Sequence, residues 1–358
     1  MTGDRVERSA TSGAKSLRRV GLVYVTDDVP GLRRQRVGKS FAYFFQNGKR
    51  LRNAAAIDRI RRLAIPPAYS HVWICASADG HIQATGRDAR GRKQYRYHAR
   101  WREHRDAAKF DRLAAFAKRL PRLRRQIDAD LRAAGLPRRK VLATVVRLLE
   151  TSFIRVGNEE YLRSNGSYGL TTLRNRHARV RGENVTFEFR GKSGKYHSFA
   201  LADARLARIV RRCQELPGQK LFQFRNEEGK PEDIDSDDVN AYIREVIGEE
   251  YSAKDFRTWA GTLLAAQALA NDGAGTAAAR KRRVVSTIAE VAERLGNTPA
   301  VCRKCYIHPF VLDAFMNETL ALPPARGRSH NGLSAQERAL IALLRSATRK
   351  NGIAQRSR

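Results

Sequence analysis

The chain has 358 residues, of which 42% are hydrophobic, enough to bury a sizeable core and to exclude wholesale disorder. Its 69 Lys and Arg against 36 Asp and Glu give a net charge of +33, which points to a polyanionic partner, nucleic acid first and an anionic membrane surface second. It has no run of about 18 apolar residues, no apolar secretory signal and only four Cys, so we expect a cytoplasmic protein without membrane spans or disulfides.

The first hundred residues carry short strand-like runs rather than long helical patterns. We expect residues 1–20 to form a basic tail, and strands to follow at Leu22–Val25, Phe41–Phe45 and Val72–Cys75. Turn signals such as Asn47-Gly48 separate these runs, and Ala54–Ala64 has the spacing of one short helix. Residues 21–99 are therefore predicted to form a small β-rich N-terminal domain.

From residue 100 onward the apolar spacing becomes helical. Helices are predicted at Trp101–Leu120, Arg122–Ala134, Lys140–Val156, Leu201–Leu216, Val239–Gly248, Asp255–Ala270, Thr276–Leu295 and Pro299–Leu320. Between the third and fourth of them, residues 173–201 alternate with period two around a turn at Gly191–Lys195, which predicts a small antiparallel sheet. Residues 323–358 are expected to form a basic C-terminal tail in which Leu333–Ser346 is helical.

The predicted fold class is therefore α+β. A β-rich N-terminal domain is followed by a mostly α-helical domain over residues 100–322 that carries the small sheet. Two domains joined near residue 100 are suited to closing around a duplex as a C-shaped clamp, which fits the polyanionic partner that the net charge indicates.

Searches for nucleotide and metal motifs give no complete match. Two Gly-Lys-Ser triplets, beginning at Gly38 and Gly191, lack the first glycine of a P-loop. The alternating Asp233, Asp235 and Asp237 lack the glycine and final Glu of a calcium loop, and we expect Ser236, Asp237 and Asp238 to cap and charge the start of the next helix. Cys302 and Cys305 form a lone C-x-x-C, whereas a closed zinc site needs four ligands. We expect no cofactor and no metal, so that any chemistry relies on side chains alone.

Displacement at a phosphodiester without a cofactor needs three kinds of group. It needs a nucleophile, positive charge on the non-bridging oxygens, and an acid for the leaving oxygen. Arginine suits the second role because its planar fork stays charged and binds in a bidentate manner, and a lysine suits the third. A tyrosine nucleophile would store the bond energy in a phosphotyrosyl ester. The C-terminal half holds such a set in the order Arg155, Lys192, Arg257, Asn297, Tyr306.

With this order and spacing, the chain resembles the type IB DNA topoisomerases of the small poxvirus and bacterial kind. The resemblance extends from about Gly21 to about Leu320, and it includes Gly80–Asp88 and Gln94–His98, which resemble the DNA-gripping N-terminal domain of that family. It implies a tyrosine recombinase/topoisomerase IB-like fold and a monomer that binds double-stranded DNA in the bacterial nucleoid. The implied activity is relaxation of supercoils of either sign, by transient cleavage of one strand, strand rotation and religation without ATP.

The resemblance also implies a role for each residue of the set. Tyr306 attacks the scissile phosphate to form a 3′-phosphotyrosyl link, and Lys192 protonates the departing 5′ oxygen. Arg155 and Arg257 bind the non-bridging oxygens. Asn297 donates a hydrogen bond to one of them, at a position where many relatives carry His; a neutral amide donates but carries no charge. Lys254, three residues before Arg257, is an assistant near the leaving strand.

A second group of residues is expected to contact DNA from the N-terminal domain. The stretch from Arg87 to His98 mixes basic and aromatic side chains, which suits the DNA backbone and grooves better than a merely solvated loop. The expected contacts are Gln83, Arg87, Arg92, Lys93, Tyr95 and Tyr97.

Two alternatives remain at this point. A tyrosine recombinase shares the Arg, Lys, Arg and Tyr chemistry, but recombinases usually show His-x-x-Arg where this chain has Lys254-x-x-Arg257, and their N-terminal domain is usually helical. The other alternative is a DNA-binding protein that kept the fold and lost catalysis. Each residue of the set has an ordinary structural role when taken singly, and their joint spacing is what favours the enzyme.

Overall fold

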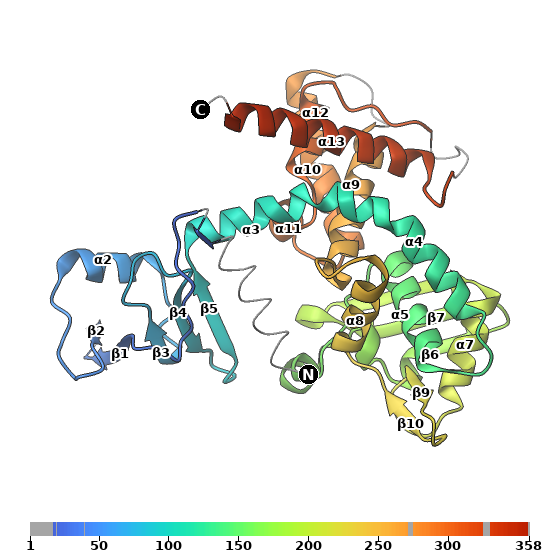
Figure 1. Cartoon of the computed structure of the whole chain (residues 1–358), viewed down its shortest axis with the longest axis horizontal. Coiled ribbons are helices and arrows are strands. Elements are labelled where there is room, and N and C mark those ends of the chain that lie inside the picture. The colour runs from blue at the N-terminus through green and yellow to red at the C-terminus, as the bar shows by residue number, and fades with distance from the viewer. Residues whose placement is uncertain (1–16, 19, 39, 271–274, 325–329, 357–358) are drawn as a thin grey trace. The chain divides into compact units, whose positions relative to one another are not determined.

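The computed structural model describes residues 17–18, 20–38, 40–270, 275–324 and 330–356, with side chains described up to residue 346. The predicted basic tail over residues 1–20 lies almost wholly outside these ranges. The chain divides into two compact units, Met1–Lys109 and Phe110–Arg358 (Figure 1). No helix within the described ranges combines the length and apolar character that a membrane span requires.

The first unit is built on a five-stranded antiparallel sheet in the order β2-β1-β3-β4-β5. Its strands are β1 (Leu32–Val37), β2 (Ser40–Phe44), β3 (Ser70–Ile74), β4 (Ile82–Arg87) and β5 (Lys93–Tyr97). Helix α2 (Ala54–Arg62) begins at Asn53, whose side chain accepts a hydrogen bond from the Ala56 amide at 2.9 Å. Its buried Ile60 joins Leu32 and Ile74 in a small core. The β-rich N-terminal half predicted from the sequence is confirmed.

The first unit differs from the prediction in two places. The expected strand at Leu22–Val25 is wrong, because only Val23 makes an isolated parallel bridge, to Gly80. Strand β1 was not expected, because four of its six residues are polar or charged. Apolar content alone misses such a strand, since β1 lies inside the sheet through its backbone pairing with β2 and β3 while only Leu32 is deeply buried.

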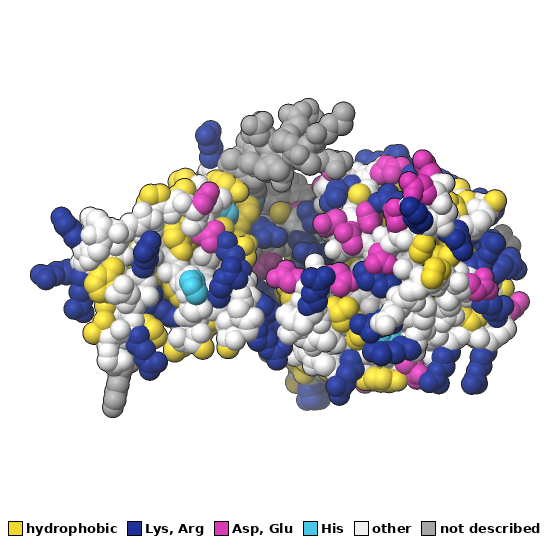
Figure 2. Space-filling model, turned by 90° about the horizontal axis from the view of Figure 1, so that it is seen from below, with side chains coloured by type: hydrophobic (Ala, Val, Ile, Leu, Met, Phe, Trp, Pro, Cys, Tyr) yellow, Lys and Arg dark blue, Asp and Glu magenta, His cyan; other side chains and the backbone are white. Residues whose placement is uncertain are grey.

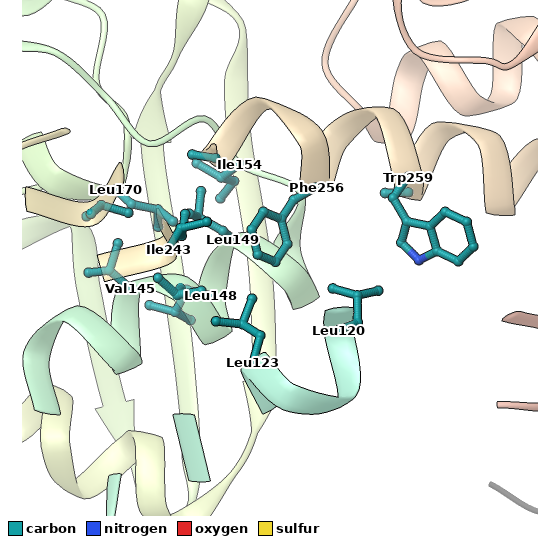
Figure 3. Close-up of a cluster of buried hydrophobic side chains, with 14 of the residues drawn as sticks. Leu120, Leu123, Val145, Leu148, Leu149, Ile154, Leu170, Ile243, Phe256 and Trp259 are labelled. Carbon is teal, nitrogen blue, oxygen red and sulfur yellow. The ribbon is translucent and has the colours of Figure 1, made fainter. Parts of the chain in front are cut away.

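Helix α3 (Ala99–Asp111) leads into a second unit that is mostly helical. Its helices are α4 (Leu113–Leu131), α5 (Arg138–Ser152), α6 (Glu159–Asn165), α7 (Ala204–Gln214), α8 (Ser236–Ile247), α9 (Ala253–Ala270), α10 (Ala277–Arg294), α11 (Pro299–Cys305), α12 (Pro309–Met316) and α13 (Ala335–Arg356). A three-stranded antiparallel sheet contains β6 (Ala178–Arg181), β7 (Asn184–Arg190) and β8 (Tyr196–Ala202), and a separate short pair contains β9 (Gln223–Arg225) and β10 (Pro231–Asp233). In Figure 3, Phe256 of α9 points into the core between Leu149 of α5 and Leu123 of α4.

The break expected at Pro121 between two helices is wrong. Pro121 lies inside α4, and the chain instead leaves the helix at Arg112, between α3 and α4. A proline inside a helix loses one backbone hydrogen bond and costs about 3 kcal/mol. Burial outweighs that cost here, because the flanking Leu120 and Leu123 are both 1% exposed in the main core, worth about 1.5–3 kcal/mol each.

Two motif interpretations can be compared with the structure. The helix does begin in this acidic segment, with Asp237 and Asp238 in the first turn of α8, but the capping residue is Asp235, one position before the expected Ser236. Its side chain accepts hydrogen bonds from the amides of Asp237 at 2.8 Å and Asp238 at 2.9 Å. Cys302 is buried in α11, and Cys305 at the end of the same helix is partly exposed. Over the described ranges, no three His, Cys, Asp or Glu residues gather closely enough to hold a metal ion.

Helix α13 includes the expected helix Leu333–Ser346 from Ala335 onward and packs against α4 and α9. Leu340 and Leu344 are 0% and 1% exposed in the main core of the second unit. Arg124 of α4 bonds to the carboxylates of Glu150 in α5 and Glu337 in α13, each at 2.7 Å. The segment expected as a tail therefore contributes both apolar and ionic contacts to the helical unit.

Lowering the pH is expected to loosen this helix. Burial acts to raise the pKa of Glu337, but hydrogen bonds and the Arg124 charge outweigh it and bring the pKa below the ordinary value of 4.5. The Arg124–Glu337 ion pair therefore stabilises the fold fully above about pH 4.5. That stabilisation is lost as the pH falls through the lower pKa that Glu337 has in the folded state. In thermal melts, Glu337→Gln should lower Tm at pH 7 and narrow the difference between pH 7 and pH 3.5. An unchanged pH dependence would contradict this.

Candidate active site

The end of helix α5 places Arg155. Phe153 ends the helix in the left-handed region, with φ of 59°, and the next residues pair with residues 169–171. The amide of Leu170 donates to the Arg155 carbonyl at 3.0 Å. A Cβ at Gly169 would lie 2.5 Å from the Gly157 Cα, so only glycine allows the two segments to approach this closely. The backbone of Arg155 is thereby fixed while its side chain remains half-buried.

Arg257 lies one turn into helix α9 and is 4% exposed. Its Nη1 donates to the Phe153 carbonyl, and its Nη2 donates to the Leu295 carbonyl at 2.5 Å. These two carbonyls stand at the C-terminal ends of α5 and α10, where backbone oxygens lack helical partners. Arg257 therefore joins the ends of two helices, while its buried Nε has no hydrogen-bond partner in the described structure.

Tyr306 lies where the chain leaves helix α11. The single helix expected at Pro299–Leu320 is wrong, because the chain breaks between α11 and α12. Pro309 begins α12, and the His308 side chain caps that helix by accepting from the Phe310 amide at 3.2 Å. The ring centroid of Tyr306 lies 5.1 Å from Cζ of Arg257, an arrangement of cation over aromatic ring.

Helix α9 contacts the backbone at this break between α11 and α12. A Cβ at Gly261 would lie 2.6 Å from the Tyr306 carbonyl oxygen, so the missing side chain lets the helix approach the Tyr306 backbone. The Thr262 hydroxyl lies 3.2 Å from the same carbonyl and accepts from the His308 amide at 3.1 Å. The backbone directly after the tyrosine ring, from the Tyr306 carbonyl to the His308 amide, is thus bonded to a buried threonine.

Asn297 is 9% exposed and lies three residues after the end of α10. Its Oδ1 accepts a hydrogen bond from Nη2 of Arg155 at 2.6 Å, which leaves Nδ2 as the donor of the side chain. Nδ2 lies 3.4 Å from the Leu295 carbonyl, a long and weak contact. The amide is therefore oriented by Arg155 and retains a donor that is only weakly engaged.

The two arginines form a cationic pair with no acidic partner. No carboxylate pairs with Arg155 or Arg257 anywhere in the described part of the chain. Burial, and then the charge of Arg257, lower the pKa of Arg155 to about 10, so both groups remain cationic at neutral pH. Both also interact electrostatically with Tyr306. Since buried like charges need compensation, the arrangement favours an anion bound beside the tyrosine.

The two lysines of the predicted set lie apart from this cluster. Lys192 is exposed in the turn between β7 and β8, and Lys254 is exposed in the first turn of α9. No ion pair or hydrogen bond engages the ammonium of either lysine within the described ranges. The hairpin itself reaches the cluster, because Nζ of Lys195 donates to the Asn297 carbonyl at 2.9 Å. The structure thus joins four of the five predicted residues and places Lys192 on a turn tied to one of them.

Comparison with known proteins decides the family. Residues 98–322 match the family model described as the catalytic core of eukaryotic DNA topoisomerase I, and residues 40–88 match that of the bacterial DNA topoisomerase IB N-terminal domain. The chain belongs to the type IB DNA topoisomerase family. It is 30% identical to DNA topoisomerase 1B of Acanthamoeba polyphaga mimivirus, over 80% of this chain and 88% of the relative. It is 24% identical to DNA topoisomerase 1B of vaccinia virus, over 68% and 75% respectively.

In the N-terminal unit of this topoisomerase, the structure corrects one expected DNA contact. Gln83 is 2% exposed. Its Nε2 donates to the carbonyls of Ala78 at 2.9 Å and Gly80 at 2.7 Å, and its Oε1 accepts from Arg59 at 2.5 Å. Because its donors and acceptor are engaged inside the unit, Gln83 orders the loop before β4 rather than facing solvent.

The other expected contacts lie at the surface of strands β4 and β5 and the turn between them. Tyr95 is 44% exposed and stacks on Tyr97, with ring centroids 5.9 Å apart. The three cations are each anchored, Arg87 on the Gly91 carbonyl, Arg92 on Asp88 and Lys93 on Asp27, all at 2.7 Å. Figure 2 shows Lys and Arg over the visible surface of both units, with Asp and Glu mostly on the helical one.

Sequence reasoning missed two residues of the site, Lys195 and His197. Both lie close to the turn of the β7–β8 hairpin that contains Lys192. The alternation of side chains along β8 does indicate His197. His197 pairs with Phe189 of β7 and lies on the same face of β8 as Phe199. A histidine at an inward position of an amphipathic strand is a candidate for a role in the site that the strand approaches.

Proposed function

We propose that this topoisomerase relaxes positive and negative supercoils of double-stranded DNA by cutting and resealing one strand. The Tyr306 oxygen attacks the phosphorus, the bond from phosphorus to the 5′ oxygen breaks, and the phenolic proton passes to solvent. Lys192 donates a proton to the departing 5′ oxygen. The 3′-phosphotyrosyl ester keeps the bond energy, so that religation by the 5′-hydroxyl needs no ATP, and torsion in the DNA drives the rotation between the two steps.

The observation that carries this proposal is the cationic pair beside Tyr306. Arg155 and Arg257 supply two guanidinium groups without an acidic partner, one of them with an unpaired buried Nε. A scissile phosphate would occupy this position, and the fixed donors would bind its non-bridging oxygens as negative charge develops. Asn297 would add a hydrogen bond from Nδ2. Such preorganised donors stabilise the transition state because the protein does not have to reorganise during the reaction.

The remaining assignments complete the proposal. Lys254, exposed one turn before Arg257, assists near the leaving strand, and Arg87, Arg92, Lys93, Tyr95 and Tyr97 contact DNA from the N-terminal unit. The enzyme acts as a monomer on DNA of the bacterial nucleoid, with no cofactor. The net charge of +33 supports strong binding that weakens as salt rises, because each contact to a phosphate releases condensed counterions.

The decisive experiment is relaxation of supercoiled plasmid in EDTA without ATP. Reactions stopped with denaturant are run on gels before and after protease treatment. Relaxation together with a covalent protein–DNA adduct supports the proposal. Binding without relaxation or adduct would reject it and favour a protein that only binds DNA, and joined recombinant duplexes without plain relaxation would favour a recombinase.

Replacing Arg257 by Lys is expected to slow cleavage on the order of 10²- to 10³-fold, the usual effect of losing one transition-state donor. Lysine keeps the charge but cannot bind two oxygens as a planar fork. Single-turnover cleavage of a labelled duplex measures the rate, and filter binding measures DNA affinity. The matched control is Arg211→Lys on α7, an exposed arginine, which should react normally. A normal rate for Arg257→Lys would remove Arg257 from the anion site.

A further inference from the structure

His197 has no role in the mechanism proposed above, although it lies where the β7–β8 hairpin meets the segment that carries Asn297. It lies on β8, opposite Phe189 of β7, and its ring stacks on Phe189 with centroids 5.3 Å apart. The imidazole is half-buried, and no hydrogen bond of its ring is seen in the described part of the chain. Its contribution therefore comes from its shape and packing.

Two glycines enclose this ring. A Cβ at Gly191 would lie 2.5 Å from Cδ2 of His197, and a Cβ at Gly296 would lie 2.7 Å from its Cε1. Gly191 directly precedes Lys192 on the hairpin, and Gly296 directly precedes Asn297. The imidazole thus fills the space between the two chain segments that carry the leaving-group acid and the amide donor. A second link, from Lys195 to the Asn297 carbonyl, runs alongside at 2.9 Å.

The charges around His197 explain why it stays neutral. Burial, and then the positive charges of Arg155, Arg257 and Lys195, lower the pKa of His197 below its usual value of 6.5. The ring is therefore uncharged at pH 7 and adds no repulsion to a site already crowded with cations. A neutral, flat side chain suits a position between two glycine backbones and beside an aromatic ring.

We infer that His197 is a positioning residue that sets the hairpin carrying Lys192 against the Gly296–Asn297 segment. The inference rests on the proposed function, since it assumes that Lys192 protonates the 5′ oxygen. Without the imidazole, the space between Gly191 and Gly296 is empty, and the turn is free to displace Lys192 from the leaving oxygen. Proton donation should then suffer more than the attack by Tyr306.

The test compares two leaving groups in single-turnover cleavage by His197→Ala. One duplex has the natural 5′ oxygen at the scissile phosphate, and the other has a bridging 5′ sulfur, which departs without protonation because a thiol has a pKa of about 8.5. We expect cleavage of the oxygen duplex to slow about 10- to 100-fold, the effect of a displacement of roughly 1 Å. The sulfur duplex should be cut within about 3-fold of the parent rate. His197→Gln, which keeps a planar group, should recover part of the loss.

Three controls separate the possible failures. Lys192→Ala should show a larger loss on oxygen and the same recovery on sulfur; if it does not recover, the proposed general acid fails rather than the role of His197. If Lys192→Ala recovers and His197→Ala does not, the positioning role is overturned. Phe199→Ala, on the same face of β8 and stacked on Phe187 at 4.7 Å, should slow both duplexes equally if it slows either.

A double-mutant cycle checks the contact itself. Gly191→Ala alone should slow cleavage, because its new methyl group meets the imidazole. In the His197→Ala background the same substitution should cost less, since the ring is gone and space is available. Additive effects of the two substitutions would show that His197 does not position this turn, and they would overturn the inference.

Discussion

Tyr306→Phe is expected to bind DNA as the parent protein does and to show no relaxation and no covalent adduct. Phenylalanine keeps the ring over Arg257, 5.1 Å from its Cζ in the parent, so the cluster of cations keeps its packing. Only the attacking oxygen is lost. Because enzymes accelerate their reactions by about 10⁶-fold or more, a site without its nucleophile leaves no measurable turnover.

The measurement is plasmid relaxation and adduct formation, with DNA affinity determined on the same preparation. Tyr196→Phe provides the matched control, because Tyr196 is 66% exposed on β8 and the substitution removes the same atom from a neighbouring element. It should relax plasmid at the parent rate. Measurable relaxation by Tyr306→Phe would place the nucleophile elsewhere and would leave the cationic pair without an explanation.

Lys192→Ala should slow cleavage of a natural duplex on the order of 10²- to 10⁴-fold, the usual range for a general acid. Lys192 is exposed, and removing its side chain breaks no hydrogen bond or ion pair within the described ranges. Thermal stability should therefore stay unchanged while the rate falls. A duplex with a bridging 5′ sulfur should recover most of the rate, because its leaving group needs no proton.

Lys195→Ala is the matched comparison for this lysine. Lys195 lies on the same hairpin and is also exposed, but its Nζ donates to the Asn297 carbonyl at 2.9 Å. Because His197 still fills the space between Gly191 and Gly296 in this variant, the turn should keep Lys192 in place. Loss of Lys195 should then act through Asn297 and slow both duplexes to a similar extent, without selective recovery on sulfur. If sulfur instead rescues Lys195→Ala and leaves Lys192→Ala slow, the two lysines exchange roles and the general acid is Lys195.

Local patterns predicted the elements of the helical unit better than its breaks. The long helices α5, α9 and α10 and the hairpin of β7 and β8 appear where their apolar periodicity places them. The two errors have different causes. Pro121 remains inside α4 because its neighbours are buried, so tertiary packing outweighs the local preference of proline. The helix expected at Pro299–Leu320 breaks at a local signal that the apolar pattern hides, because Pro309 and the His308 cap begin a new helix.

The candidate site was predictable only as an ordered set of residues. Arg155, Arg257, Asn297 and Tyr306 are spread over about 150 positions, and nothing in their spacing shows that carbonyls at two helix ends receive Arg257. The resemblance to a family supplied their order, and the fold supplied their proximity. His197 was not among the predicted site residues because its contacts are with two glycines. A residue that acts by filling space between backbones leaves no chemical motif in the sequence.

The break between α11 and α12 has a mechanical consequence. During strand rotation the DNA would pull on the protein through one covalent bond at Tyr306. The load would then pass into a short connection in which the Tyr306 carbonyl and the His308 amide are bonded to Thr262, and whose backbone lies against Gly261. Both residues lie in the buried middle of α9, where side chains are closely packed and deform little. A torque on the nucleophile would therefore be borne by the hydrophobic core rather than by a surface loop.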